Sequence, residues 1–340
     1  MKKRTLKVPM SRGEDVRREL IEGGFLDKDY LIDKEGGFLY LPVKDEHLDY
    51  LDTSGDFEVV ERNLERRPDR VRSYKDLVKV PDELFELLPS SFDVLGDIAI
   101  IKLKPELYEY RGEIADALLK QNRNLNKVAL DRGVKGEFRV RDLEPVAGGE
   151  NLETTHVENN LRFKLDPSEV YFSPRLTTER IRIAEKVGEE RVLDMFAGVG
   201  PFSINIARHG RPEEVVAIDL NPACVKYLDL NIKLNSVDDI VTPYLGDSRE
   251  VVPTLGSFDR VILNLPHSSF DFLDLAMDAA DEGVIHLYSI LDSNEVMSAV
   301  KRIQDIAGSS GKRIGIEEMR EVHNYSPSMH MMAFDISLIG

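Results

Sequence analysis

The chain of 340 residues contains one cysteine, Cys224, and this scarcity limits the chemistry that it can perform. A single cysteine excludes an internal disulfide, a cysteine zinc cluster and a cysteine-ligated iron–sulfur site. The seven histidines include no pair at the i, i+4 spacing of a helical zinc site, so no metal is expected. A protein without disulfides is expected in the reducing environment of the cytoplasm.

Long hydrophobic runs are also missing. No apolar stretch approaches the roughly 18 residues that a membrane-spanning helix needs, so no membrane association is expected. The basic residues at the start of the chain lead into no apolar segment, which argues against a secretory signal. Hydrophobic residues make up 42% and charged residues 31%, as in an ordinary globular protein. The length suggests two or three domains.

Positive charge is in deficit, because 45 Lys and Arg stand against 62 Asp and Glu, for a net charge of −17. Taken alone, this charge argues against a nucleic-acid partner, since phosphate binding needs local positive potential. Two local basic stretches oppose that conclusion, although by charge alone a solvated surface is the simpler interpretation. They comprise Arg62, Arg66, Arg67, Arg70, Arg72 and Lys75, interrupted by acids, and Lys120, Arg123, Lys127, Arg132, Lys135, Arg139 and Arg141, with Asp131 and Glu137 between them.

Sequence patterns divide the chain into three units. Residues 1–61 mix strand-like and helix-like segments and predict a small N-terminal α/β domain. Residues 62–75 are charged and lack apolar periodicity, which predicts a linker. Residues 76–165 combine short strands, one helical stretch and a polar hairpin, and suit a binding module. Strands and helices then alternate in residues 166–340, which predicts a parallel, doubly wound sheet with a late antiparallel strand. Ser173 and the proline after it predict a helix N-cap there.

The segment 194–202, DMFAGVGPF, is the most informative. A buried strand ends at Asp194, passes through two glycines that allow close approach of a ligand, and enters a helix. The next strand ends at Asp219, where doubly wound folds place an acid on ribose hydroxyls. A dinucleotide site would need a third glycine where Ser203 stands, and a phosphate-binding P-loop would need an absent G-K-[ST]. The third interpretation is a class I S-adenosylmethionine site, because the segment resembles the D-x-F-A-G-x-G motif of those methyltransferases and an acid at 194 suits a ligand with an ammonium and a sulfonium. A plain strand–turn–helix without a ligand is the remaining alternative.

The third and fourth strands also end in polar residues. Asp247 fits a contact to an adenine amino group, or is a surface turn residue. Asn264-Leu265-Pro266-His267 departs from the [N/D]-P-P-[Y/F] tetrad of amino-nitrogen methyltransferases, which disfavours an adenine-N6 enzyme. Asn264 offers a donor and an acceptor to a guanine edge, although a plain turn is the alternative. Cys224 is expected to be a small buried residue, so the pyrimidine C5 methyltransferases, which need a cysteine nucleophile, are excluded.

Together these motifs resemble the archaeal-type tRNA (guanine-37-N1)-methyltransferases, a class I family shared by archaea and eukaryotes. The matching segments span nearly the whole chain and are LYLPV (39–43), DVLGDIAII (93–101), VKGEFRVRDLE (134–144), VYFSPRLTTER (170–180), DMFAGVGPF (194–202), AIDLNP (217–222), GDSRE (246–250) and NLPHS (264–268). The resemblance implies a Rossmann-like catalytic domain preceded by two smaller α/β (α+β) domains. It implies a monomer that uses S-adenosylmethionine to methylate N1 of guanosine 37 in tRNA.

The resemblance also implies roles for individual residues. Glu179 takes the general-base role at N1, and Arg139 stabilises the negative charge that grows on O6. Asn264 positions the guanine, and Tyr171 packs near the cofactor and the base. The cofactor-binding set is Asp194, Phe196, Gly198, Gly200, Asp219, Asp247, Asn264, Pro266 and Arg180. Without the resemblance, the sequence pattern predicts that Glu179 is a surface acid and Arg139 a surface cation.

Other implications concern the RNA. The first domain would touch the outer corner of tRNA, and the basic residues from 120 to 141 would hold the anticodon arm while the target base leaves its stack. One departure is that the family's R-L-G-G-E-R is R-L-T-T-E-R here, which alters backbone freedom beside Glu179.

Two alternatives stay open. The first is a wyosine-pathway transferase, which moves the aminocarboxypropyl group of the same cofactor or methylates a tricyclic guanine. The second is a non-catalytic RNA-binding protein with a relict cofactor fold; it predicts loss of Asp219 or of the glycines, all of which are present.

Overall fold

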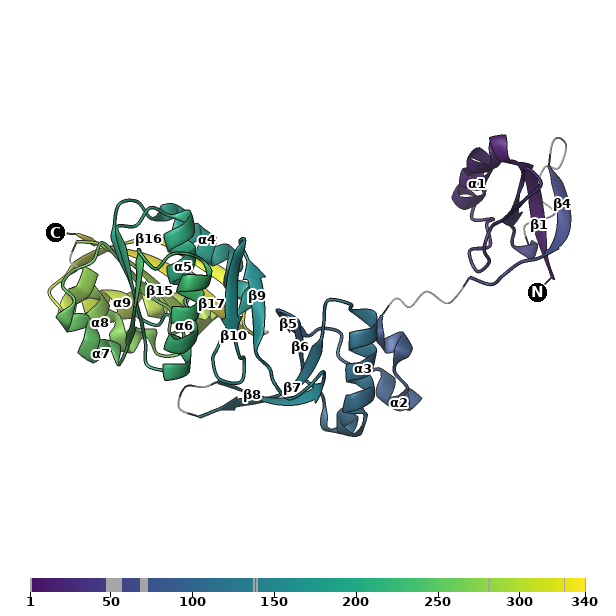
Figure 1. Ribbon diagram of the computed structural model, residues 1–340. Helices are drawn as coiled ribbons and strands as arrows, with labels where there is room; N and C mark the ends of the chain where they lie inside the picture. The colour runs from purple at the N-terminus through teal and green to yellow at the C-terminus, as the bar shows by residue number, and fades with distance from the viewer. Residues whose placement is uncertain are drawn as a thin grey trace. The chain divides into compact units, whose positions relative to one another are not determined.

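The computed structural model describes residues 2–46, 57–67, 73–136, 138, 140–280, 282–326 and 328–339. They form two compact units, Met1–Leu77 and Val78–Gly340, shown in Figure 1. Each unit has its own sheets and its own buried core.

The first unit is built on an antiparallel sheet of four strands in the order β2-β3-β1-β4. In β1, Leu6 and Val8 alternate with polar residues and pack in one cluster with Val16 and Leu20, which lie four residues apart on α1. The elements are β1 (Lys2–Pro9), α1 (Gly13–Glu22), β2 (Asp33–Glu35), β3 (Phe38–Pro42) and β4 (Glu58–Asn63).

The expected linker begins later than residue 62. Strand β4 runs to Asn63, and the backbone N–H of Arg67 donates to the Asp29 carbonyl at 2.6 Å. Arg62 pairs with Asp33 at 2.6 Å and lies over the Tyr40 ring, 3.8 Å from its centroid. Its charge is therefore compensated across the sheet. For this reason the charged segment from residue 62, which was predicted to be a linker, begins within strand β4. Of the other basic residues in this stretch, Arg70 and Arg72 lie outside the described residues.

The second unit begins with a four-stranded sheet in the order β5-β6-β7-β8. Strands β6 and β7 are parallel, and α3 makes the crossover between them. Ile114 and Leu118, four residues apart on α3, are buried. The elements are α2 (Asp82–Phe85), β5 (Asp93–Leu95), β6 (Ile98–Ile101), α3 (Arg111–Gln121), β7 (Lys127–Lys135) and β8 (Val140–Ala147).

The rest of the second unit is a seven-stranded sheet in the order β13-β12-β11-β14-β15-β17-β16, with helices packed against it (Figure 1). Strands β11 to β15 are parallel, and β17 joins β15 antiparallel. The predicted α/β fold is confirmed, including its late antiparallel strand. The elements are α4 (Thr177–Lys186), β11 (Arg191–Asp194), α5 (Pro201–His209), β12 (Glu214–Asp219), α6 (Pro222–Leu234), β13 (Val241–Leu245), α7 (Ser248–Val251), β14 (Arg260–Leu263), α8 (Leu273–Ala280), β15 (Val284–Asp292), α9 (Val296–Ser309), β16 (Arg313–Asn324) and β17 (Met329–Ile339).

A hairpin of β9 (Thr154–Glu158) and β10 (Leu161–Leu165) is bound to helix α6. The Asn231 side chain bonds both the backbone N–H and the carbonyl of Lys164, at 2.7 and 3.1 Å. Asn235 does the same for Arg162, at 2.9 and 2.7 Å. The hairpin therefore packs with the large sheet, although the sequence boundary at 165 assigned it to the middle domain.

The helix predicted after Ser173 begins with a 3-10 turn, Pro174–Leu176, and α4 follows. Ser173 stands at the N-cap with an extended backbone and Pro174 is the first helical residue, as predicted, although the Ser173 side chain makes no capping hydrogen bond. The Ser173 carbonyl instead accepts a hydrogen bond of 2.8 Å from Arg180.

Candidate functional site

Four polar residues stand at the carboxyl ends of four neighbouring parallel strands. Asp194 ends β11 and Asp219 ends β12, while Asp247 and Asn264 follow β13 and β14 within two residues. Carboxyl ends of parallel strands meet at one edge of the sheet, which is where open α/β folds bind ligands. The structure thus brings these four predicted residues to one edge.

The glycine loop between β11 and α5 is fastened to Asp219. Gly198 and Gly200 have φ of +57° and +89°, a region that favours glycine. The Gly198 N–H donates to Asp219 Oδ2 at 2.7 Å, and the Asn221 N–H donates to Oδ1 at 2.8 Å. Each Asp219 oxygen therefore keeps acceptor capacity for a hydroxyl group. Burial raises the pKa of Asp219.

Asp194 is buried and only half satisfied. Its Oδ2 accepts a hydrogen bond of 2.7 Å from the Ser203 hydroxyl, but its Oδ1 has no partner among the described residues. Burial raises the pKa of Asp194 to about 7. A carboxylate in such a place is stabilised by a positively charged ligand group. The loop and its two acids therefore fit a cofactor that carries ribose hydroxyls and positive charge.

Other members of the predicted cofactor set lie around this loop. Phe196 meets Phe272 edge to face, with 4.9 Å between ring centroids. Asp247 caps α7 by accepting from the Arg249 N–H at 2.8 Å, so its adenine contact stays a prediction. The Pro266 carbonyl accepts a hydrogen bond of 3.2 Å from Ile290.

Tyr171 and Arg180 differ in exposure. Tyr171 is 55% exposed, and its carbonyl oxygen lies near the glycine loop, 3.9 Å from where a Cβ on Gly198 would be. The buried Arg180 pairs with Glu158 of the hairpin at 2.6 Å, and its Nε has no partner in the described ranges. Burial lowers the pKa of Arg180. Its guanidinium is committed to the hairpin, and its cofactor contact stays a prediction.

Glu179 is buried, with 1% of its surface exposed, so its interpretation as a surface acid is wrong. Tyr288 donates to Oε1 at 2.8 Å, Arg182 contacts the same oxygen at 2.7 Å, and Arg320 contacts Oε2 at 2.8 Å. The register explains the place of Tyr288, because Leu263 pairs with Leu287, and Asn264 and Tyr288 are the residues that follow these two along neighbouring strands. The Tyr288 side chain therefore links Glu179 to the strand next to the one that ends before Asn264.

The two threonines before Glu179 start α4. The Thr177 hydroxyl lies 2.9 Å from Glu158 Oε2 and 2.7 Å from the Pro174 carbonyl oxygen, and can donate to either. The threonine that stands in place of the family's glycine thus joins the start of α4 to the β9–β10 hairpin.

The side-chain oxygen of Asn264, Oδ1, is buried and has no hydrogen-bond partner in the described part of the chain. It is therefore available to accept a hydrogen bond from a ligand.

A charged network that the sequence did not reveal extends from Glu179 across the sheet. Arg182 also contacts Asp335 at 2.7 Å, and Asp335 accepts from His286 Nδ1 at 2.6 Å. His286 Nε2 faces an Arg260 nitrogen at 2.6 Å; because arginine only donates, this imidazole is neutral with its proton on Nδ1. Burial works against ionisation of Asp335, yet these hydrogen bonds hold its pKa far below the usual range. An acid within the apolar stretch MHMMAFDISL was the available sequence signal.

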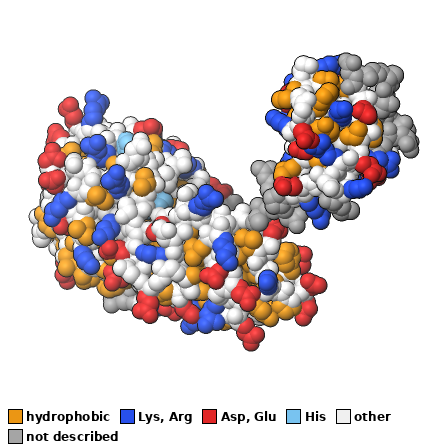
Figure 2. Space-filling model, turned by 45° about the vertical axis from the view of Figure 1, so that its right-hand side comes forward, with side chains coloured by type: hydrophobic (Ala, Val, Ile, Leu, Met, Phe, Trp, Pro, Cys, Tyr) orange, Lys and Arg blue, Asp and Glu red, His pale blue; other side chains and the backbone are white. Residues whose placement is uncertain are grey.

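Three of the seven basic residues between 120 and 141, Arg132, Lys135 and Arg141, are paired with carboxylates. The ion pairs and hydrogen bonds of this stretch are Arg132 with Glu144, Lys135 with Asp142, Arg141 with Asp93, and Lys127 with the Glu153 carbonyl. On the face shown in Figure 2, Lys and Arg side chains are interspersed with Asp and Glu. Arg139, the predicted O6 cation, lies outside the described residues.

Cys224 is buried, as predicted. Burial and the neighbouring Asp219 raise the pKa of its thiol, so it is a poor nucleophile. Within the described ranges, no three His, Cys, Asp or Glu side chains are grouped to hold a metal ion. No helix in those ranges is long and apolar enough to cross a membrane.

Comparisons with known proteins agree with this geometry. The TRM5/TYW2 methyltransferase domain model matches residues 154–315, the TYW2 N-terminal domain model 74–151, and the tRNA methyltransferase 5 N-terminal domain model 5–50. A tRNA (guanine(37)-N(1))-methyltransferase Trm5b from Pyrococcus abyssi is 44% identical over 334 residues, covering 97% of each chain.

Two further likenesses bear on function. A solved complex of aTrm5 and tRNALeu has a TM-score of 0.84 and 37% identity, covering 99% of this chain and 100% of that chain. A tRNA(Phe) (4-demethylwyosine(37)-C(7)) aminocarboxypropyltransferase from Pyrococcus horikoshii is 31% identical over 266 residues, 76% of this chain and 92% of the relative. The resemblance inferred from the motifs is confirmed, and the chain belongs to the S-adenosylmethionine-dependent TRM5/TYW2 methyltransferase family.

Proposed function

We propose that this enzyme methylates N1 of guanosine 37 in the anticodon loop of tRNA. The observation that carries the proposal is Glu179, a buried carboxylate joined through Tyr288 to the strand end that carries Asn264. The same edge of the sheet carries the glycine loop with Asp194 and Asp219. A base, a group for the guanine edge and a cofactor loop thus converge.

The chemistry requires the N1 proton to leave and negative charge on O6 to be stabilised. When bound, S-adenosylmethionine supplies an electrophilic methyl group. Asp219 would hold the ribose hydroxyls, and Asp194 would offset the positive charge. Asn264 orients the guanine, Tyr171 packs beside it, and Arg139 takes the O6 role by resemblance.

Glu179 needs access to N1, which its three donors restrict. Of these donors, Arg320 has the most exposed side chain, at 29%, against 15% for Arg182 and complete burial for Tyr288. We infer that the guanine edge displaces Arg320 from Glu179 Oε2, while Tyr288 and Arg182 keep holding the carboxylate.

The domains take roles accordingly. We assign residues up to 67 to tRNA recognition at the outer corner, residues 76–153 to the middle RNA-binding domain, and residues 154–340 to the catalytic domain. The catalytic boundary moves from 166 to 154 because the β9–β10 hairpin is bound to α6. The enzyme is proposed to act in the cytoplasm, because its single cysteine is buried and free, as is usual in a reducing compartment. It is proposed to act as a monomer by resemblance to the family.

The second candidate is aminocarboxypropyl transfer, favoured by the 31% identity to the Pyrococcus horikoshii relative. Two preparations of S-adenosylmethionine distinguish the reactions, one labelled in the methyl group and one in the methionine carboxylate. Transfer of only the methyl label to tRNA supports the proposal. Transfer of the carboxylate label instead would replace it with the second candidate.

A further inference from the structure

Three motif segments that are far apart in the sequence meet at the carboxylate of Asp93. Asp93 begins β5 and opens DVLGDIAII, a segment without a role in the site described above. Arg141 of β8 donates to Asp93 Oδ2 at 2.8 Å, and Arg175 of the turn before α4 donates to Oδ1 at 3.0 Å. Each carboxylate oxygen thus accepts a hydrogen bond from a different arginine, one on β8 of the same sheet and one in the 3-10 turn before α4.

This contact is partly shielded from water. The side chains of Asp93 and Arg141 are 24% and 19% exposed, whereas that of Arg175 is 53% exposed. Burial opposes the ionisation of Asp93, but the hydrogen bonds from Arg141 and Arg175 lower its pKa. Partly buried ion pairs are screened less by salt than exposed ones. The Asp93–Arg141 pair is therefore expected to be stronger than an ordinary surface ion pair.

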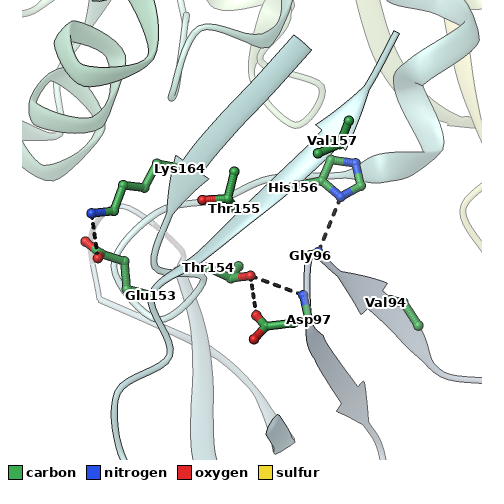
Figure 3. Close-up of a pocket in the computed structure, with 9 residues that line it drawn as sticks. All are labelled: Val94, Gly96, Asp97, Glu153, Thr154, Thr155, His156, Val157 and Lys164. Carbon is green, nitrogen blue, oxygen red and sulfur yellow. Dashed lines mark hydrogen bonds and ion pairs between the residues drawn. The ribbon is translucent and has the colours of Figure 1, made fainter. Parts of the chain in front are cut away.

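The turn between β5 and β6, just after Asp93, contacts the β9–β10 hairpin. Gly96, with φ of +56°, lies so close to Thr154 that a Cβ would collide with its side chain. Asp97 Oδ1 accepts from the Thr154 hydroxyl at 2.5 Å, and the Gly96 N–H donates to His156 Nδ1 at 3.4 Å, as Figure 3 shows. These residues line a cavity of about 640 Å³ that lies at this junction rather than at the strand ends.

The core is continuous through the junction. Leu95 belongs to the same buried cluster as Phe163 of the hairpin and Phe172 of the segment before α4. Strand β5 is held by two arginines at Asp93, and the turn after it is held by Thr154, so this segment connects the middle sheet with the hairpin and with the turn before α4.

We propose that Asp93 is a positioning residue for methyl transfer, holding β8 of the middle domain and the turn that leads into α4 in one fixed relation. The inference rests on the proposed function, because Glu179 lies four residues after Arg175 on that helix.

Electrostatics predict what the loss of Asp93 would do. Without it, the guanidiniums of Arg141 and Arg175 would face each other with no carboxylate between them, and like charges repel. Arg141 would keep Asp131, at 3.8 Å. Separation of the two segments by even a fraction of an ångström is costly for a transfer reaction, since rates depend steeply on the alignment of reacting groups.

The test compares Asp93→Ala, Asp93→Glu, Arg175→Ala and the Asp93→Ala/Arg175→Ala double variant by single-turnover methylation at saturating tRNA and cofactor. Asp142→Ala is the matched control, because Asp142 pairs with Lys135 at 2.9 Å within the same β7–β8 hairpin. We expect Asp93→Ala to lower the single-turnover rate at least about tenfold, with unchanged affinity for S-adenosylmethionine. Asp93→Glu should recover part of the rate, and Arg175→Ala should cost little in the Asp93→Ala background.

Three results would overturn the proposal. One is an unchanged rate at saturating tRNA with only a raised KM, which would make Asp93 or Arg175 a tRNA-binding contact. Another is additivity of the two substitutions, and the third is an equal loss in Asp142→Ala. Asp93→Asn, which preserves shape, replaces Asp93→Ala if the latter does not fold. Full activity in Glu179→Gln would instead refute the proposed base and leave the Asp93 result standing.

Discussion

The Tyr288 hydroxyl donates a hydrogen bond of 2.8 Å to Glu179 Oε1, although 109 residues separate the two in the chain. Tyr288 lies on β15 beside Asn264, and Glu179 lies on α4. This bond connects a helix outside the sheet with the edge where four strands end. It places the proposed base within one side chain of the group proposed to orient the guanine.

Glu179→Gln should lower turnover at least about tenfold while leaving the affinity for S-adenosylmethionine nearly unchanged, because it removes a base and no cofactor contact. Glu185→Gln is the control, since Glu185 lies exposed on the same helix. Steady-state kinetics with calorimetry of cofactor binding measure both effects. Unchanged turnover in Glu179→Gln would remove this residue from the base role.

Asp219→Ala should weaken binding of S-adenosylmethionine, with a dissociation constant raised by about tenfold or more. The substitution removes the proposed ribose partner and also the acceptor of the Gly198 N–H. Asp238→Ala removes a charge from an exposed position and should leave binding unchanged. Calorimetric titration of the three proteins decides the matter. Equal dissociation constants for wild type and Asp219→Ala would contradict the ribose assignment.

Gly200→Ala should destabilise the protein by roughly 1–3 kcal/mol, as expected for strain combined with a steric clash. A Cβ at this position would lie 2.5 Å from Leu228 Cδ1, in a backbone with φ of +89°. Gly256, with φ of +78° and open space around it, is the matched control for backbone strain alone. Denaturant unfolding compares them. A loss in Gly256→Ala as large as in Gly200→Ala would show that close packing is not the cause.

The affinity for S-adenosylmethionine should rise with pH up to about 7 and level off above it. Burial raises the pKa of Asp194 to about 7, so this carboxyl is largely protonated below that pH, and a positively charged ligand favours its ionised form. Binding then releases a proton, which costs less as the pH rises. Burial also raises the pKa of Asp219, which acts in the same direction.

Calorimetry between pH 5.5 and 8.5 tests this dependence, with Asp194→Asn as the control that removes the Asp194 contribution. The same shift bears on stability, because a raised pKa in the folded state stabilises it at low pH. The free energy of unfolding of wild type relative to Asp194→Asn should therefore fall as the pH rises from about 4 to about 7. A flat cofactor affinity across pH 7 would contradict the assignment.

The sequence predicted that Asp194, the glycine loop and Asp219 meet at one edge of the sheet because the signals for this arrangement are local. Asp194, the glycine loop and Asp219 are each recognisable from a strand end and a turn within a few residues. The polar hairpin of β9 and β10 was also predicted from the sequence, because a tight turn joins two short strand-like segments. Cys224 was predicted to be buried for its residue type alone, and it is.

The surroundings of Glu179 were not predictable in the same way. Its partners Tyr288 and Arg320 lie on strands more than 100 residues further along the chain, so no local pattern marks them. Burial by these partners overrides the helical pattern that placed Glu179 on the surface. The sequence placed Arg62 in a linker, but Arg62 lies in strand β4. Its charge is compensated by Asp33, which the local sequence pattern did not indicate.

The most direct measurement is methyl transfer from labelled S-adenosylmethionine to two tRNA transcripts that differ only in having G or A at position 37, with the product nucleoside identified by mass spectrometry. The account predicts 1-methylguanosine from the G transcript and no methylated product from the A transcript. A methylated product from the A transcript, or none from the G transcript by a protein that binds the cofactor, would contradict it.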